Sequence, residues 1–174
     1  MARFSGKVAI VTDITTSKGQ DLIISSTLKK FGQINILINN AGANLPDASG
    51  NTRSNCAIEN LQKMLQLNLQ SVVEMTQKTR PHLAKTRGEI VNISSIGAAA
   101  RGLSAEDSLK FYNSMGEIPH CIPAGYCGQP EHLASVIAFL ADRKASEYIV
   151  GQTIIADGGT SLVLGMHSVF GVKK

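Results

Sequence analysis

The stretch that decides the fold is Ile34-Asn35-Ile36-Leu37-Ile38-Asn39-Asn40-Ala41-Gly42. Residues 34–38 form a short apolar run that is typical of a strand buried on both faces of a sheet. The run ends abruptly in two asparagines, at the end of the strand where α/β proteins bind their ligands. Asn39-Asn40 is therefore either a plain turn, since asparagine favours turn geometry, or the rim of a binding site.

Strand-like and helix-like runs alternate on both sides of this stretch. Three more short apolar runs predict strands, and three segments with apolar residues at helical spacing predict helices. The predicted strands are Lys7–Val11, Ile34–Ile38, Glu89–Ile93 and Gln152–Ala156, and the predicted helices run from about Gln20 to Gly32, from Ile58 towards Arg80, and from Pro130. This alternation indicates a parallel sheet with right-handed crossovers, so we expect an α/β fold in one domain over residues 1–174.

The longest predicted helix places an amide, Asn68, on its apolar stripe. The other members of that stripe are Leu61, Met64, Leu65, Val72 and Thr76. A buried amide without partners costs about 1–3 kcal/mol, so Asn68 needs hydrogen bonds if this face is buried. We expect Asn68 to be either a satisfied structural amide or part of a site.

A second polar pair, Ser94-Ser95, follows the predicted strand Glu89–Ile93. A serine at this point could cap a following helix. The carboxyl ends of parallel strands share one edge of the sheet, however, so Ser94-Ser95 and Asn39-Asn40 are expected to lie at the same edge. This coincidence favours a site over two unrelated turns.

These residues resemble motifs of the short-chain dehydrogenase/reductase family. Residues 39–42 are similar to its NNAG motif, and residues 88–95 resemble the strand that delivers its catalytic serine, here Ser95. Asn68, within Leu67-Asn68-Leu69, matches the helix asparagine of its catalytic tetrad. Asp13-Ile14-Thr15 resembles the segment whose carboxylate contacts the adenine ring, and residues 128–131, 139–141 and 151–159 follow the family's C-terminal pattern.

The resemblance implies a Rossmann-like, doubly wound parallel sheet and an oxidoreductase that interconverts an alcohol and a carbonyl compound with NAD or NADP. Ser95 would hold the substrate oxygen through a hydrogen bond that strengthens as charge develops on that oxygen. Asn68 would support the proton relay. The cofactor-binding residues that the resemblance implies are Asp13, Ile14, Asn39, Ala41 and Gly42.

Two parts of the family pattern are missing from the chain. The catalytic Tyr-x-x-x-Lys is absent, because the residues four positions after Tyr112, Tyr126 and Tyr148 are Gly116, Pro130 and Gln152. The stretch around Tyr112 reads as a polar loop. The turn Thr-Gly-x-x-x-Gly-x-Gly, which cradles the cofactor diphosphate, is also absent, because Thr12 passes directly into Asp13. If the 174 residues are the whole molecule, a catalytically inactive binding or regulatory protein is the alternative.

Both gaps have clean edges, which drift by point mutation would not produce. The first opens after Thr12, and the second lies between residues 97–100 and 121–123. We expect the strands that remain to lose pairing partners, which is costly for a parallel sheet. This expectation favours ordered segments of a longer chain over an internally shortened variant.

Composition and charge indicate a soluble intracellular globular domain, and the resemblance implies a small-molecule substrate. The chain is 43% hydrophobic and 17% charged, and none of its apolar runs approaches the roughly 18 residues of a membrane span. The formal charge of +4 comes without a basic stripe, so we expect no nucleic-acid partner and no membrane partner. Three cysteines without an export signal predict free thiols in the reducing cytoplasm.

Two further expectations concern metals and assembly. A metal site is suggested by His120, Cys121, Cys127 and His132. The two thiols are farther apart than in the Cys-x₂₋₄-Cys pairs of structural zinc sites, so we expect no metal. The resemblance implies a homodimer or homotetramer.

Overall fold

The computed structural model describes residues 3–12, 16–50, 56–95, 105–118 and 121–163. The chain divides into two compact units. The first comprises Met1–Ser95 and Phe139–Tyr148, and the second comprises Ile96–Ala138 and Ile149–Lys174.

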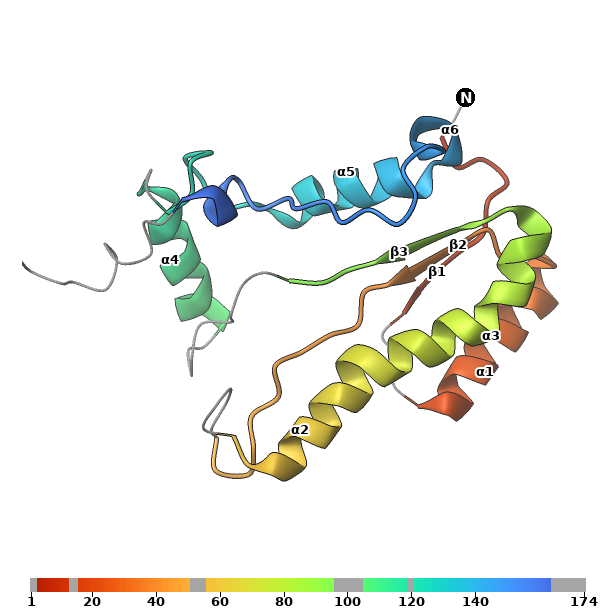
Figure 1. The fold of residues 1–174 in the computed structure, drawn as a ribbon, viewed down its shortest axis with the longest axis horizontal. Coiled ribbons are helices and arrows are strands. Elements are labelled where there is room, and N and C mark those ends of the chain that lie inside the picture. The colour runs from red at the N-terminus through yellow and green to blue at the C-terminus, as the bar shows by residue number, and fades with distance from the viewer. Residues whose placement is uncertain (1–2, 13–15, 51–55, 96–104, 119–120, 164–174) are drawn as a thin grey trace, which may run out of the picture. The chain divides into compact units, whose positions relative to one another are not determined.

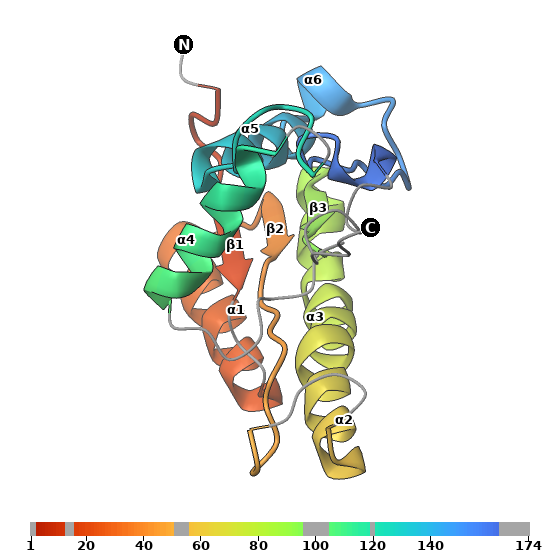
Figure 2. The same ribbon diagram turned by 90° about the vertical axis from the view of Figure 1, so that its left-hand side faces the viewer.

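A three-stranded parallel sheet forms the centre of the first unit (Figures 1 and 2). Its strands are β1 (Ala9–Thr12), β2 (Ile36–Asn39) and β3 (Glu89–Asn92), in the order β1-β2-β3. The register pairs Thr12 with Asn39 and Asn39 with Asn92, so the three strands end at one level. The parallel sheet and three of the predicted strands are thereby confirmed.

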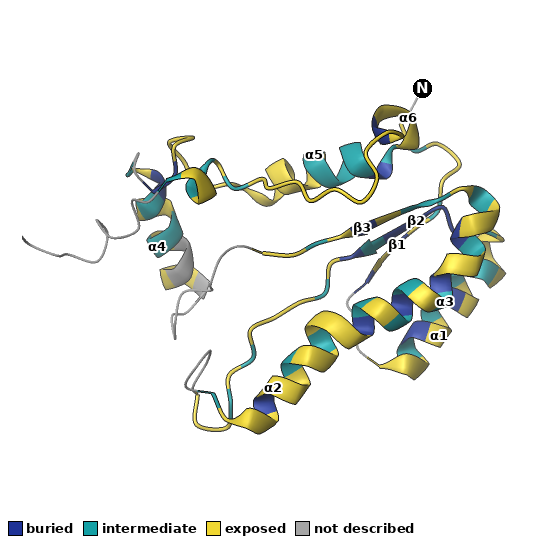
Figure 3. Cartoon of the chain, in the orientation of Figure 1, coloured by how far each residue is buried: buried dark blue, intermediate teal, exposed yellow. Residues whose placement is uncertain are grey.

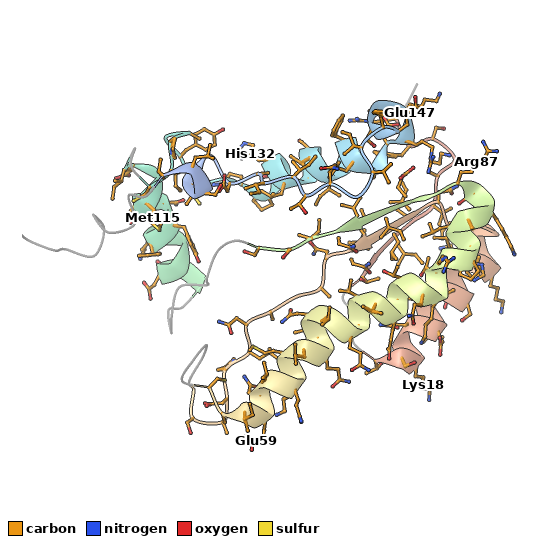
Figure 4. All side chains as sticks on the ribbon, viewed as in Figure 1. Lys18, Glu59, Arg87, Met115, His132 and Glu147 are labelled. Carbon is orange, nitrogen blue, oxygen red and sulfur yellow. The ribbon has the colours of Figure 1, made fainter. Side chains whose placement is uncertain are left out.

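Two helices, α1 (Ser17–Phe31) and α3 (Ser71–Thr86), contact each other, and α3 also contacts β2 and β3. Together with the strands they bury the hydrophobic core, which consists of Ile10, Ile24, Ile34, Leu37, Met75 and Leu83. Figure 3 shows these buried positions on the strands and along the helices of this unit. Lys18 in the first turn of α1 and Arg87 just after α3 lie at opposite ends of the helix pair (Figure 4).

Local signals set the ends of α1. Thr16 accepts a hydrogen bond from the Gly19 N–H at the start of the helix, with N···O 3.2 Å. Gly32 ends it in the left-handed conformation at φ 73°, and its N–H donates to the Leu28 carbonyl at 2.8 Å. This is the glycine cap that the sequence predicts.

The long helix from Ile58 is confirmed, but its buried face is not the predicted one. It consists of α2 (Ile58–Leu65), the π-helical turn η2 (Gln66–Gln70) and α3 without a break. Leu61 and Leu65 are 43% and 49% exposed. The buried positions are Asn60, Ser71, Met75, Thr79 and Leu83. The π turn shifts the phase of the helix, and α2 continues past the strand ends, where no strand of the described residues lies beneath it (Figures 1 and 2).

The three strands still pair with one another despite the missing segments. In the Rossmann order 3-2-1-4-5-6 the first strand lies between the second and the fourth, so loss of the second strand opens one side of the first and leaves the other paired. The structure agrees, because β1 pairs directly with β2, and Val11 on β1 is 59% exposed. Among the described residues no strand pairs with the other side of β1, which agrees with the expected loss of a pairing partner there.

The fourth predicted strand, Gln152–Ala156, is not a strand. All five of its residues are exposed, and among the described residues none pairs with it in a ladder. A strand requires a neighbour for its backbone N–H and C=O groups. The β-branched residues of this segment are not sufficient to form a strand without such a neighbour.

A short segment of the C-terminal part belongs to the first unit. Its helix α6 (Arg143–Ser146) begins after Asp142, which pairs with Arg3 at 2.7 Å. Arg143 pairs with Glu89 at the start of β3, at 2.6 Å. The Arg3 hydrogen bond lowers the pKa of Asp142 below its usual value. Two ion pairs thus join this segment to the strand-bearing part of the chain.

The second unit contains α4 (Ala105–Gly116), most of α5 (Pro130–Ala141) and the short 3₁₀ helix η3 (Thr160–Leu162). Helix α5 begins at Pro130, as predicted. Tyr112 lies within α4, so the expectation of a loop around it is wrong. Within the described ranges, every helix is too short or too polar to cross a membrane.

Candidate active site

The side chain of Asn68 holds the loop that follows β2. Its Nδ2 donates to the Ala43 carbonyl at 2.9 Å, and its Oδ1 accepts from the Ala43 N–H at 2.9 Å. Asn68 lies in the π turn and is exposed, so the expectation that it faces the core is wrong. Its amide is nevertheless satisfied, because both polar atoms bond the same residue.

Gly42 allows this loop to approach the helix closely. A Cβ atom at Gly42 would lie 3.1 Å from Asn68 Oδ1, which is tighter than most Cβ contacts. A side chain there would crowd the atom that accepts from Ala43. The glycine of the Asn39-Asn40-Ala41-Gly42 stretch therefore has a steric role in this structure.

Asn39 ties the carboxyl ends of two strands to a helix. It is 2% exposed, and its Nδ2 donates to Asn92 Oδ1 on β3 at 2.8 Å and to Thr76 Oγ1 on α3 at 3.2 Å. Its carbonyl accepts from the Ile93 N–H at 2.9 Å. Asn39 therefore holds the strand ends together from a buried position. Its direct contact with a cofactor remains a prediction.

Ser95 lies three residues past the end of β3 and is exposed, as is Ser94. The loop held by Asn68 begins one residue past the end of β2. Because β2 and β3 run parallel in register, both segments leave the sheet at the same edge. Asp13 and Ile14, expected beside the adenine, lie outside the described residues.

The connection from β1 to α1 does not fit the diphosphate of a dinucleotide. Only residues 13–16 separate Thr12 from Ser17, and none of them is a glycine. The Gly19 N–H in the first turn of α1 is bonded to Thr16, and Lys78 pairs with Asp21 at 2.8 Å. A diphosphate cradle requires glycines that let the backbone and a helix N-terminus approach the anion.

Cys121 and His132 of the second unit have structural contacts, and His120 lies outside the described residues. Cys121 is fully buried, and His132 Nδ1 accepts from the Gln129 N–H at 2.9 Å. The His132 ring lies 5.5 Å from that of Tyr126, between ring centroids. In the described part of the chain, no three His, Cys, Asp or Glu side chains come together as metal ligands would.

Sequence reasoning missed three polar residues of α1 and α3. Gln20 on α1 and Ser71 at the end of the π turn are buried polar residues, and Thr76 bonds Asn39. A signal for Gln20 was present, because it precedes Ile24 by four residues and so shares the apolar face of its helix. A polar residue on such a face requires a partner.

The model of the short chain dehydrogenase family matches residues 4–105. The chain belongs to the short-chain dehydrogenase/reductase family. Family members are NAD(P)-dependent oxidoreductases that interconvert alcohols and carbonyl compounds. The protein is an oxidoreductase of this type. The 174 residues of the chain do not include the family's Tyr-x-x-x-Lys dyad.

Curated relatives and solved structures support this assignment. L-fucose dehydrogenase of Mus musculus is 33% identical over 92% of this chain and 74% of its own length. 3-Oxoacyl-[acyl-carrier-protein] reductase of Synechocystis is 28% identical over 87% of this chain and 75% of its own length. A short-chain dehydrogenase/reductase of unknown function from Caenorhabditis elegans, solved with cofactor, is 43% identical with a TM-score of 0.82, covering 90% of this chain and 76% of that one. The Rossmann-like α/β fold is thereby confirmed.

The comparison also shows that the chain is shorter inside the matched region. The alignment with the mouse enzyme runs over 213 positions, which is more than the 174 residues of the chain. The relative therefore carries internal segments that this chain lacks. This agrees with the two gaps that the motifs indicate.

Proposed function

We propose that the carboxyl edge of β2 and β3 is the alcohol/carbonyl site of this oxidoreductase, with Ser95 as the residue that orients the substrate oxygen. Its hydroxyl can donate to that oxygen, and the bond strengthens as negative charge develops there. The observation that carries the proposal is the double hydrogen bond between Asn68 and Ala43. It joins the loop after β2 to the helix residue that matches the family's catalytic asparagine.

Asn68 supports the proton relay through its backbone. Both polar atoms of its side chain bond Ala43, so the side chain is engaged in holding the loop. The π turn changes the hydrogen-bond spacing of the helix around it, and π turns are frequent at functional sites. The side chain then fixes the loop, and the main chain is the part that can hold a relay water.

Ala41 and Gly42 would line the nicotinamide side of the cofactor site, Asn39 would support it from below, and Asp13 and Ile14 would lie beside the adenine. The cofactor would be NAD or NADP, which supplies or accepts the hydride. The chain contains these cofactor-binding residues, but it lacks the glycine-rich turn that binds the diphosphate and the Tyr-x-x-x-Lys dyad. Catalysis accordingly belongs to a form that contains both missing segments. The relatives are dehydrogenases and reductases, which favours this enzyme over an inactive binding or regulatory protein.

Two versions of the chain test this proposal side by side. The 174-residue chain should not enhance or shift NADH or NADPH fluorescence, whereas a chain with the two segments restored from the Caenorhabditis elegans relative should bind one of them. In the restored chain, Ser95→Ala should lower kcat by about 10²-fold or more, since loss of one oxyanion donor has that effect. Ser94→Ala is the matched control and should leave kcat unchanged.

The relatives suggest the substrate panel for that assay: L-fucose, glucose, a 7α-hydroxysteroid and a 3-oxoacyl thioester. Tight dinucleotide binding by the 174-residue chain would overturn the account of the missing cradle. Equal loss of activity in Ser94→Ala and Ser95→Ala would overturn the role of Ser95. An intact mass near 18.5 kDa for the natural protein would show that it is an internally shortened variant.

The remaining expectations form part of the same proposal. The enzyme would act on a small molecule in the cytoplasm, as a single domain over residues 1–174 assembled into a homodimer or homotetramer, without nucleic-acid or membrane partners. The family membership and the modest charge of +4 support this view. Size-exclusion chromatography with light scattering measures the assembly state.

A further inference from the structure

The π turn that carries Asn68 is held from a distant part of the chain. Gln20 on α1 is 0% exposed, and its Nε2 donates to the Ser71 carbonyl at 3.0 Å. Ser71 is the residue directly after the π turn, and it is also buried. This bond spans 51 residues of sequence.

Ser71 is the residue at which the π turn joins α3. Its N–H donates to the Gln66 carbonyl five residues earlier, which is the π spacing. Its Oγ donates to the Leu67 carbonyl at 2.5 Å. The serine is thus bonded to the two residues that precede Asn68, and its own carbonyl receives Gln20.

We propose that Gln20 is a positioning residue for the active site, acting on Asn68 through Ser71. A rotation of the helix at Ser71 would move Asn68, three residues earlier, and with it the two bonds to Ala43. Water cannot replace the Gln20 bond, because both partners are buried. The inference rests on the proposed role of Asn68 in the site.

A second link between the same helices provides a matched control. Lys78 on α3 pairs with Asp21 at 2.8 Å and donates to the Ser17 carbonyl at 2.9 Å. These contacts are partly exposed and join α1 to α3 without touching the π turn. Loss of Lys78 therefore loosens the helix pair, but it does not release Ser71.

Residue-resolved amide hydrogen exchange on the 174-residue chain tests the proposal. The Ala43 N–H reports the position of Asn68, and the amides of β2 report the stability of the unit. Gln20→Met removes the donor at similar volume. It should lower the protection of Ala43 by about tenfold more than that of β2, as expected for one hydrogen bond. Lys78→Met should change both by the same factor.

If Gln20→Met lowers the protection of the Ala43 amide and of the β2 amides by the same factor, the proposal is overturned, because Gln20 is then a general stabiliser. If Gln20→Met does not fold, Gln20→Asn is measured in the same way. It keeps a polar amide but is one methylene too short to reach Ser71. This readout is independent of catalysis. A failure of Ser95→Ala to affect the restored enzyme would therefore remove the proposed function and leave the exchange result standing.

Discussion

Gly88 joins α3 to β3, and its replacement by alanine should strongly destabilise the first unit. A Cβ atom there would lie 2.4 Å from the Asn35 carbonyl oxygen and 2.7 Å from Leu83 Cδ2. The Asn35 carbonyl is a backbone atom that accepts from the Glu89 N–H at 3.0 Å, so it cannot move without disturbing the start of β3. The turn therefore sets the position of the strand that leads to Ser95.

The size of the effect follows from three contributions. Overpacking against backbone costs about 1–3 kcal/mol, and weakening of the Glu89 hydrogen bond adds about 1 kcal/mol. The lower entropy of the unfolded chain returns about 0.4–1 kcal/mol. We expect a net loss of about 1–3.6 kcal/mol in the free energy of unfolding for Gly88→Ala, toward the upper end because the 2.4 Å contact is with a backbone atom.

Urea denaturation followed by far-ultraviolet circular dichroism measures this loss. Gly32→Ala is the matched control in the same unit, because its Cβ would meet no atom within 4 Å and only its φ of 73° opposes alanine. That variant should lose about 1 kcal/mol. A Gly88→Ala protein as stable as Gly32→Ala would show that the turn yields to a side chain, and the steric argument would be refuted.

Two further predictions concern the core and acid stability. Leu37→Ala, at a fully buried position on β2, should lower the free energy of unfolding measured in urea by about 2–5 kcal/mol. Val11→Ala, on the exposed side of β1, should lower it by under about 1 kcal/mol. Equal losses would contradict the observed burial. Burial raises the pKa of Asp157, but hydrogen bonds from Ser161 and Gly159 lower it more, so this pKa lies below its usual value. Because the folded pKa is lower than the unfolded one, the ionised carboxylate stabilises the turn above the unfolded pKa, and this stabilisation is lost as pH falls through the folded pKa. The Gly159 and Ser161 amide shifts should therefore titrate in NMR spectra with a midpoint below the pKa of an ordinary aspartate, and not at all in Asp157→Asn.

Much of the fold and part of the site could be predicted because the signals are local. The apolar runs of β1, β2 and β3, the cap at Gly32 and the start of α5 at Pro130 depend on neighbouring residues. The polar residues after β2 and β3 predict the edge of the sheet at which the proposed site lies, because parallel strands bring their carboxyl ends together. The local order of residues was sufficient to predict these features.

Other features could not be predicted because they depend on partners far along the chain. The run Gln152–Ala156 has the composition of a strand, but a strand forms only where another backbone can bond to it. The outward face of α2 followed from the absence of a sheet beneath it, which periodicity cannot show. The direct pairing of β1 with β2 likewise follows from strand order in space.

Asn68 separates the two kinds of information. The sequence alone identified this residue as an amide that needed partners, because it interrupts an apolar stripe and resembles a family motif. Only the tertiary structure decided how that need is met. The π turn exposes the side chain, Ala43 supplies both partners, and Gln20 anchors the turn from α1. Periodicity describes one helix at a time, whereas these bonds are made between segments that only folding brings together.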